Sequence, residues 1–269
     1  MINDDKKDVH DFWNESSCGE DLFMSTYDRE NYLAQSLKRY DLEPYIIDFA
    51  DFESTRDKNI LEIGVGLGAD HQRFIESGAI TTGIDLTSRA IENTGNRLKL
   101  FKLESSLSVC DAENLNFNDC SFEEVYSWGV IHHSPDTQKA VNEIYRVLVT
   151  GGIAKIMIYN KWSIVGLMLW VRYALMKFKP FLSLEIIYSK YLESPGTKAY
   201  TKDEAKKLFA KFSKVTIETV LTHSDLLTSD AGQRHEGALL NIVRKIWPRF
   251  LIKMLFPEAG LFMLIKAVK

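Results

Sequence analysis

The sequence predicts an α/β protein with a doubly wound, mostly parallel sheet of seven strands, a helical segment before it and two helical insertions late in the chain. Three observations lead to this prediction. Short apolar runs alternate with segments of helical apolar spacing from residue 59 to residue 158, which is typical of βα units in a parallel sheet. Glycines recur at alternate positions, 64, 66 and 68, after the first apolar run. Two long stretches, 160–212 and 222–260, separate the last predicted strands.

Residues 1–50 are predicted to form a helical lid, ahead of a main domain at 51–269. This segment is rich in aromatic residues, among them Phe12, Trp13 and Tyr27. One interpretation is that these side chains pack on the main domain. The other is that the segment covers a ligand site, with Tyr27 as a candidate for contact with substrate.

The glycine-rich turn predicts a nucleotide-type site. The apolar run at 60–63 predicts a strand, and the apolar spacing after residue 69 predicts a helix at about 70–77. Glycine permits positive φ and close approach of a ligand to the backbone. The helix that follows directs free N–H groups at that ligand. Gly64, Gly66 and Ala69 also fit the dinucleotide-binding pattern, so a nicotinamide-dependent oxidoreductase is one alternative.

The remaining elements place polar residues at successive strand ends. Strands are predicted at 82–86, 106–109, 124–128, 153–159, 214–221 and 261–268, with helices at about 87–101 and 136–148. Ligands of such sheets bind beyond the carboxyl ends of the strands. Asp85, Asp111 and the segment 127–136 therefore become candidate binding residues.

Taken in order, these motifs resemble the class I S-adenosylmethionine-dependent methyltransferases, and most closely their small-molecule branch, often called type 11. The resemblance covers roughly residues 58–160. It rests on Glu62 with Gly64, Gly66 and Gly68, on Asp85, on 111–113, on 127–133, and on Arg146 with the glycine pair 151–152. It implies a Rossmann-like methyltransferase fold and S-adenosylmethionine as the cofactor.

The resemblance also implies roles for individual cofactor-binding residues. The three glycines would let the backbone approach the methionine part, and Glu62 would orient the turn and the ligand's amino group. Asp85 would accept from the ribose hydroxyls, with Leu86 beside the adenine. Asp111 would accept from the adenine amino group, next to Ala112. Backbone groups of Ser127 and Trp128 would meet the methionine ammonium, and Trp128 is also a candidate wall of the substrate cavity.

His132 and His133 are the candidate catalytic residues. They lie in the loop where a methyl acceptor is expected, and histidine has a suitable pKa for removing a proton from it. The alternative is that one of them binds backbone and fixes the loop. No acidic trio at metal-ligand spacing accompanies the pair, so we expect no metal. A site built from Cys18, Cys110 and Cys120 is a marginal alternative, because cysteines are more often plain buried residues.

Both late insertions leave strand carboxyl ends and are predicted to roof the acceptor site. Residues 162–179 and 238–256 are apolar, contain tryptophan and lysine or arginine, and contain no acid. Such segments are typical of contact with a membrane surface, although an apolar stripe more commonly packs inward. Candidate substrate residues in the first insertion are Tyr188, Tyr191 and Tyr200. Weaker ones in the second are His223, Arg234 and His235.

Composition limits the class of protein. Hydrophobic residues make up 45% and charged residues 26% of the 269 residues, as in ordinary globular proteins. The net charge of −4 and the lack of an Asn-Pro-Pro-Tyr-type loop argue against a nucleic-acid partner. Three widely spaced cysteines and a polar, acidic start predict a cytoplasmic protein, peripheral to a membrane if the insertions touch one. The sequence carries no signal for an oligomeric state.

The sequence therefore predicts an enzyme that methylates a small, apolar or membrane-associated acceptor, such as a quinone, phenol, thiol or lipid precursor. One alternative is a small-thiol or sulfide S-methyltransferase whose roof closes a dry cavity. Alternatives of other classes are an NAD-dependent oxidoreductase and a binding protein without catalysis.

Overall fold

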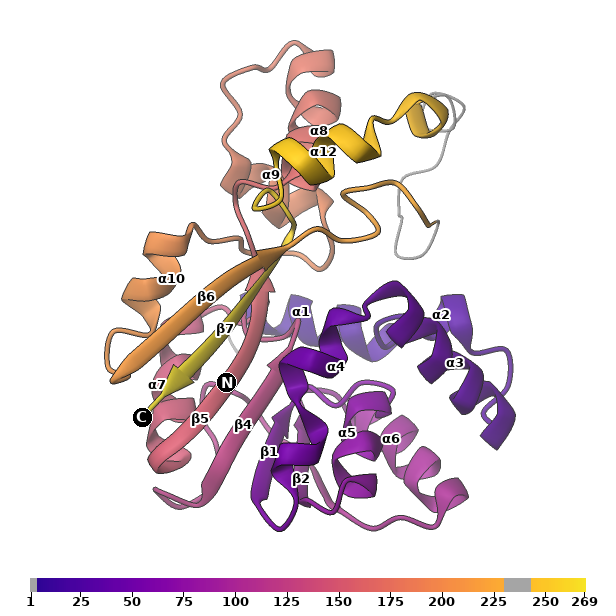
Figure 1. The fold of residues 1–269 in the computed structure, drawn as a ribbon, viewed down its shortest axis with the longest axis vertical. Coiled ribbons are helices and arrows are strands. Elements are labelled where there is room, and N and C mark those ends of the chain that lie inside the picture. Colours follow the sequence, from indigo (N-terminus) through magenta and orange to yellow (C-terminus); the bar gives the residue numbers. More distant parts are fainter. Residues whose placement is uncertain (1–3, 230–242) are drawn as a thin grey trace.

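A seven-stranded sheet forms the centre of the molecule. The computed structural model describes residues 4–229 and 243–269. The strands are β1 (Asn59–Ile63), β2 (Ile80–Asp85), β3 (Ser106–Val109), β4 (Phe122–Trp128), β5 (Leu148–Tyr159), β6 (Lys214–Val220) and β7 (Phe262–Val268). Their order is β3-β2-β1-β4-β5-β7-β6, and β7 runs antiparallel to both neighbours (Figure 1). The predicted doubly wound, mostly parallel sheet is confirmed.

Helices cover both faces of this sheet. They are α1 (Asp4–Glu15), α2 (Glu20–Phe23), α3 (Arg29–Leu42), α4 (Tyr45–Ala50), η1 (Phe52–Thr55), α5 (Ala69–Glu76), α6 (Ser88–Phe101), α7 (Thr137–Val147), α8 (Ile164–Tyr173), η2 (Leu175–Lys177), α9 (Leu184–Tyr191), α10 (Lys202–Leu208) and α12 (Arg249–Leu255). One core cluster joins the sheet to α7 and α10 through Ile144 and Phe209. The other joins the opposite face to α4, η1 and α5 through Phe49, Phe52 and Phe74.

Strand β5 begins five residues before its predicted start. The glycine pair 151–152 suggested a turn that precedes the strand at 153, but β5 runs from Leu148 through both glycines. The pairing of β4 with β5 shifts register between Phe122 and Glu124, and Gly151 has a φ of 79°. An irregularity of this kind accommodates glycines within a strand without ending it.

The first late insertion, residues 160–212, contributes helices to two different parts of the molecule. Helices α8 and α9 stand beyond the carboxyl end of β5, whereas α10 packs on the flank of the sheet beside α7 (Figure 1). Ala205 and Phe209 of the α10 segment are fully buried there. The prediction that all of 160–212 forms a roof is therefore wrong for its last part, because the apolar side of α10 completes the core.

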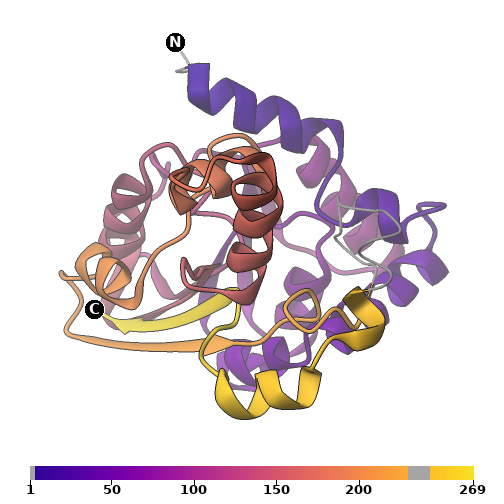
Figure 2. The same cartoon turned by 90° about the horizontal axis from the view of Figure 1, so that it is seen from above.

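The elements at the carboxyl ends of the strands come from distant parts of the sequence. Seen from above, α1 and α12 lie on opposite sides of α8 (Figure 2). Among the described residues, no helix is long and apolar enough to cross a membrane. The positions Arg234 and His235 lie outside the described residues, as do residues 238–242 of the second apolar segment.

Candidate functional site

A cavity of about 1020 Å³ opens beyond the carboxyl ends of the parallel strands. It extends from the glycine turn after β1 to the side chains of α8. Residues of α1, such as Trp13, and residues beside β7, such as Leu261, also line it. The cavity therefore combines the turn expected to hold a nucleotide with the N-terminal segment and both late insertions.

Glycine is required at each of the three positions of the turn for a different structural reason. A Cβ added at Gly64, whose φ is 85°, would lie 2.1 Å from Cγ2 of Val130. Gly68 ends the turn with a φ of 75° and precedes the first residue of α5, and its added Cβ would approach Thr94 at 2.9 Å. At Gly66 an added Cβ meets no atom within 4 Å. Gly66 thus leaves the open space that close approach of a ligand requires.

Asp85 closes the other side of this turn. Its Oδ1 accepts from the backbone N–H of Thr87 at 3.0 Å and from the Thr87 hydroxyl at 2.9 Å. Its Oδ2 accepts a long bond of 3.3 Å from the Gly66 N–H. A carboxylate has about four acceptor positions, so Oδ2 keeps capacity for hydroxyl donors. Burial raises the pKa of Asp85 above its ordinary value, which such donors would counteract.

Glu62 and Asp70 are buried carboxylates beneath the turn. Glu62 Oε2 lies 2.9 Å from Nδ1 of His71, whose Nε2 lies 2.8 Å from the Ser105 hydroxyl. Burial raises the pKa of Glu62. Asp70, which sequence reasoning missed, accepts from both Nε and Nη2 of Arg39 at 3.0 and 2.6 Å. It thereby ties α3 of the N-terminal segment to α5.

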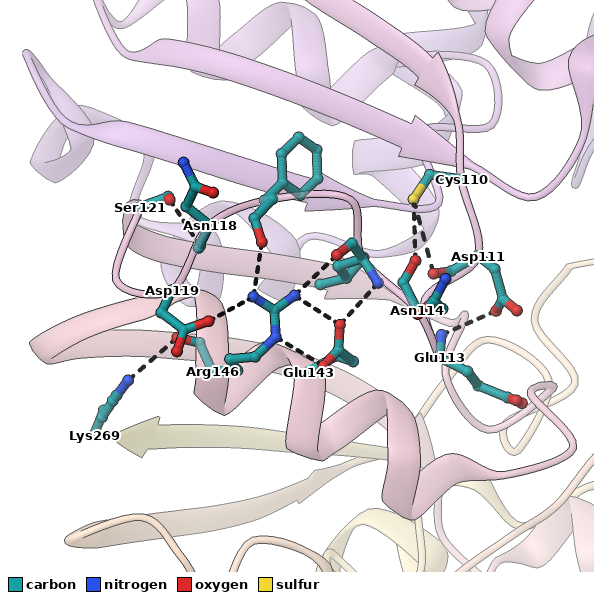
Figure 3. Close-up of polar contacts among 12 residues, drawn as sticks. Cys110, Asp111, Glu113, Asn114, Asn118, Asp119, Ser121, Glu143, Arg146 and Lys269 are labelled. Atoms are coloured by element: carbon teal, nitrogen blue, oxygen red, sulfur yellow. Dashed lines mark hydrogen bonds and ion pairs between the residues drawn. The ribbon is translucent and has the colours of Figure 1, made fainter.

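Asp111 lines the cavity, but its oxygens already have partners. Oδ2 pairs with Nζ of Lys6 at 2.6 Å, and Oδ1 accepts from the Glu113 N–H at 2.9 Å. Lys6 also pairs with Glu113 at 2.6 Å. The loop itself is fixed by Arg146, which donates to the carbonyls of Leu115 and Phe117 and pairs with Glu143 and Asp119 (Figure 3). Helix α1 thus covers the predicted adenine end.

The structure brings most of the predicted cofactor-binding residues to the cavity. The residues that line it are Glu62, Gly64, Gly66, Gly68, Asp85, Leu86, Asp111, Ala112 and Trp128. Ser127 is the exception, because its side chain is fully buried and it is not part of the lining. Trp128 both lines the cavity and packs, with ring centroids 6.0 Å from Tyr45 and 5.9 Å from Phe262.

The predicted substrate tyrosines lie elsewhere. Tyr27 is half exposed and donates its hydroxyl proton to Glu20. Tyr188 is fully buried and bonds the backbone carbonyls of Asn160 and Lys161 at 3.1 Å. Tyr191 stacks on Tyr173 at 3.9 Å, and Tyr200 donates to Thr137 at 2.8 Å. None of these four tyrosines is among the residues that line the cavity, and each uses its hydroxyl or ring in a contact within the protein, so the structure adds no support to their predicted substrate contacts.

Of the two candidate catalytic histidines, His133 lines the cavity and His132 does not. His133 Nδ1 lies 2.8 Å from the Ser194 hydroxyl and 3.0 Å from the Thr197 hydroxyl. Its Nε2 lies 3.3 Å from Oε2 of Glu193, and Trp13 packs edge-on against the ring. His132 is fully buried, and burial followed by the neighbouring His133 holds its pKa well below the usual range.

Two acids that sequence reasoning missed also face this part of the cavity. Glu193 accepts a hydrogen bond from the hydroxyl of Tyr159 at 2.6 Å. Glu43 follows the last turn of α3, 3.6 Å from Nη1 of Arg39, and burial raises its pKa to about 7 despite that cation. Neither belongs to a motif. His223, a weaker candidate, also lines the cavity.

The fold and this site define a class of protein that binds a nucleotide-type cofactor at the first βα turn. The antiparallel β7 between β5 and β6 departs from the 3-2-1-4-5-6 order of dinucleotide-binding sheets. Residues 61–156 match the family model described as methyltransferase domain. The chain thus contains a class I S-adenosylmethionine-dependent methyltransferase domain, as its motifs predicted, and the nicotinamide alternative is not supported. S-adenosylmethionine is the cofactor of this class.

Curated relatives match parts of the chain. Phosphoethanolamine N-methyltransferase 2 of Caenorhabditis elegans is 36% identical over 115 residues, which are 42% of this chain and 26% of that protein. A ubiquinone biosynthesis O-methyltransferase of Coxiella burnetii is 22% identical over 144 residues, 54% of this chain and 55% of that protein. The matched part is therefore about a quarter to about half of these relatives.

Solved structures share the fold. A phosphoethanolamine N-methyltransferase 2 from Haemonchus contortus, in complex with phosphomonomethylethanolamine and S-adenosylhomocysteine, has a TM-score of 0.54 at 21% identity. The match covers 80% of this chain and 49% of that one. A protein from Pyrococcus horikoshii has a TM-score of 0.55 at 15% identity and covers 93% of this chain and 97% of that one.

Proposed function

We propose that this protein transfers the methyl group of S-adenosylmethionine to a heteroatom of a small, apolar acceptor that reaches the cavity from a membrane surface. The observation that carries the proposal is one continuous cavity. It joins the glycine turn to an apolar compartment lined by Val165, Met168 and Leu169 of α8 and by Phe262 of β7. Quinones, phenols, thiols and lipid precursors are acceptors whose apolar bodies suit such a compartment.

The chain's own residues have separable tasks in this reaction. When bound, the cofactor supplies an activated methyl group, so the protein mainly orients the reactants and excludes water. Asp85 and the Gly66 turn hold the nucleotide end, and Trp128 forms part of the cavity wall. His133 Nε2 would take the proton that the acceptor heteroatom loses. The hydroxyls of Ser194 and Thr197 fix the ring from the other nitrogen.

The roof supports access from a membrane. Helix α12 stands at the end of the molecule away from the sheet (Figure 1). Exposed apolar side chains occur on and around both η2 and α12. Phe178 is 93% exposed, Phe181 100% and Phe250 75%. Lys177, Lys179 and Lys253 are exposed among them. Apolar side chains interleaved with cations suit an interface with anionic lipid, although Val165 and Leu169 on the inner side of α8 are buried.

Methyl transfer is tested with purified protein, S-adenosylmethionine labelled in its methyl group, and a membrane lipid extract. We expect labelled product in the organic phase. His133→Gln should lower turnover roughly 100-fold or more without changing the affinity for S-adenosylhomocysteine, whereas His10→Gln, at a partly exposed histidine of α1, should change neither. A protein that binds S-adenosylhomocysteine but labels nothing in the organic phase would contradict the proposed acceptor class.

Membrane contact is tested by flotation with vesicles of phosphatidylcholine and phosphatidylglycerol. The wild type should float with anionic vesicles and less so at high salt, because screening weakens the attraction of the lysines. Phe178→Glu combined with Phe181→Glu should abolish flotation, whereas Leu37→Glu, at a 73% exposed apolar position on α3, should not. Absence of flotation by the wild type would favour the alternative of a thiol or sulfide methyltransferase with a closed cavity.

A further inference from the structure

Two loops that are distant in sequence bring three metal-ligating side chains together beside the cavity. His132 and His133 follow β4, and Glu193 follows α9. One ligand atom from each lies within 4.8 Å of the other two. We propose that these residues form a binding site for one divalent transition-metal ion of the Zn²⁺ class. This inference goes beyond the proposed function: metal binding does not require methyl transfer, and where the ion is bound it replaces the role of base that the proposed function gives to His133.

His132 provides the first argument. Its side chain is fully buried, and neither of its ring nitrogens has a hydrogen-bond partner among the described residues. A buried polar group without a partner is destabilising because it has lost its hydrogen bonds to water, so native structures rarely leave an imidazole unsatisfied at both nitrogens. A metal ion on one nitrogen would supply the missing interaction, since neutral imidazole is the commonest metal ligand in proteins.

The spacing of the other two ligands provides the second argument. Zinc binds histidine nitrogen and carboxylate oxygen at about 2.0–2.2 Å in tetrahedral sites, which places neighbouring ligand atoms ~3.3–3.5 Å apart. His133 Nε2 and Glu193 Oε2 are 3.3 Å apart. Their separation therefore equals one edge of a tetrahedral site, with His133 and Glu193 both facing the cavity.

Hydrogen bonds from neighbouring hydroxyls fix the orientation of both His133 and Glu193. The buried hydroxyls of Ser194 and Thr197 lie 2.8 and 3.0 Å from His133 Nδ1, the nitrogen that faces away from Glu193. The hydroxyl of Tyr159 donates to Glu193 Oε2 at 2.6 Å. Metal-bound histidines and carboxylates are oriented in this way by partners outside the metal's own ligand set.

The ligand set also indicates what the ion could do. Two imidazoles and one carboxylate suit Zn²⁺ and related ions, and three protein ligands leave a coordination position open. An oxygen or sulfur atom bound there would lose its proton more readily. His133 Nε2 cannot hold an ion and take a proton together, so the metal-bound protein would not use this histidine as the base.

The test uses Co²⁺ as a spectroscopic probe and Zn²⁺ as its competitor, on the purified 269-residue chain freed of metal by a chelator. No cofactor or acceptor is added, so the outcome is distinguishable from failure of the proposed function. We expect one Co²⁺ per chain with the intense visible absorption of tetrahedral Co²⁺, displacement by one Zn²⁺, and a higher melting temperature with Zn²⁺. Glu193→Gln should weaken Zn²⁺ binding at least tenfold, and Tyr159→Phe about 10-fold.

Controls separate this site from surface binding. Glu104→Gln, at an exposed acid, and His10→Gln, at a surface histidine, should bind Zn²⁺ as the wild type does. Because His132 is buried, its variants can fail to fold. The decisive variant is therefore Glu193→Gln, whose side chain lies at the cavity wall. The proposal is overturned if the wild type shows no tetrahedral Co²⁺ spectrum, or if Glu193→Gln keeps the wild-type Zn²⁺ affinity.

Discussion

Replacing Asp70 by asparagine is expected to lower the free energy of unfolding by about 3 kcal/mol, the lower end of the cost of breaking a buried ion pair. Asp70 is only 3% exposed. Besides the two bonds from Arg39, it accepts from the hydroxyls of Tyr40 at 3.0 Å and Tyr126 at 2.9 Å. The variant would leave the Arg39 guanidinium facing a neutral amide that also donates protons. Urea unfolding of both proteins measures the difference.

The effect of pH provides a second measurement on the same variant. Burial alone would raise the pKa of Asp70, but the Arg39 guanidinium outweighs it and holds that pKa below the ordinary 3.8. A depressed folded-state pKa gives stability that is complete above the unfolded-state pKa and is lost as pH falls through the folded-state pKa. The difference between the wild type and Asp70→Asn should therefore be constant above ~pH 5 and shrink only below ~pH 4.

Asp41→Asn is the matched control for this prediction. Asp41 lies on the same helix, α3, and its carboxylate is 73% exposed beside Lys38. An exposed pair of this kind contributes about 0–1 kcal/mol. Equal destabilisation by Asp41→Asn and Asp70→Asn would contradict the role given to the buried ion pair, because burial is what distinguishes the two sites.

Replacing Asp85 by alanine is expected to weaken binding of S-adenosylhomocysteine by about 2–3 kcal/mol, the range for a lost hydrogen bond to a charged group. This corresponds to roughly a 30- to 150-fold higher dissociation constant. The reason is that Oδ2 of Asp85 has acceptor capacity left beside its long bond from the Gly66 N–H. Isothermal titration calorimetry measures the change directly.

Thr87→Val separates ligand binding from support of the turn. It removes the hydroxyl that donates to Asp85 Oδ1 at 2.9 Å but keeps the carboxylate and the backbone donor. Its affinity should stay within a few-fold of the wild type, while Asp85→Ala loses most of its affinity. If the alanine variant bound S-adenosylhomocysteine as tightly as the wild type, Asp85 would not contact the ribose.

The cofactor part of the site could be predicted from the sequence, whereas the acceptor part could not. The turn at 64–68, the strand ends at Asp85 and Asp111, and the helices α5 and α6 all lie within one or two residues of their predicted positions. Each is encoded locally, by apolar periodicity or by a glycine that takes positive φ. The tyrosines at 188, 191 and 200 show the opposite case, since composition marked them but packing directs them away from the cavity.

The sequence by itself determined the fold class and the cofactor, because their signals lie in one continuous segment whose order along the chain is also its order in the βα units. Only the tertiary structure decided what surrounds the acceptor. Trp13, Glu43 and Glu193 belong to no motif, and they line the same cavity as His133 because α1, α3 and the loop after α9 fold over the same strand ends. Contacts between side chains so far apart in the sequence depend on how whole helices pack, and local sequence patterns do not encode that packing.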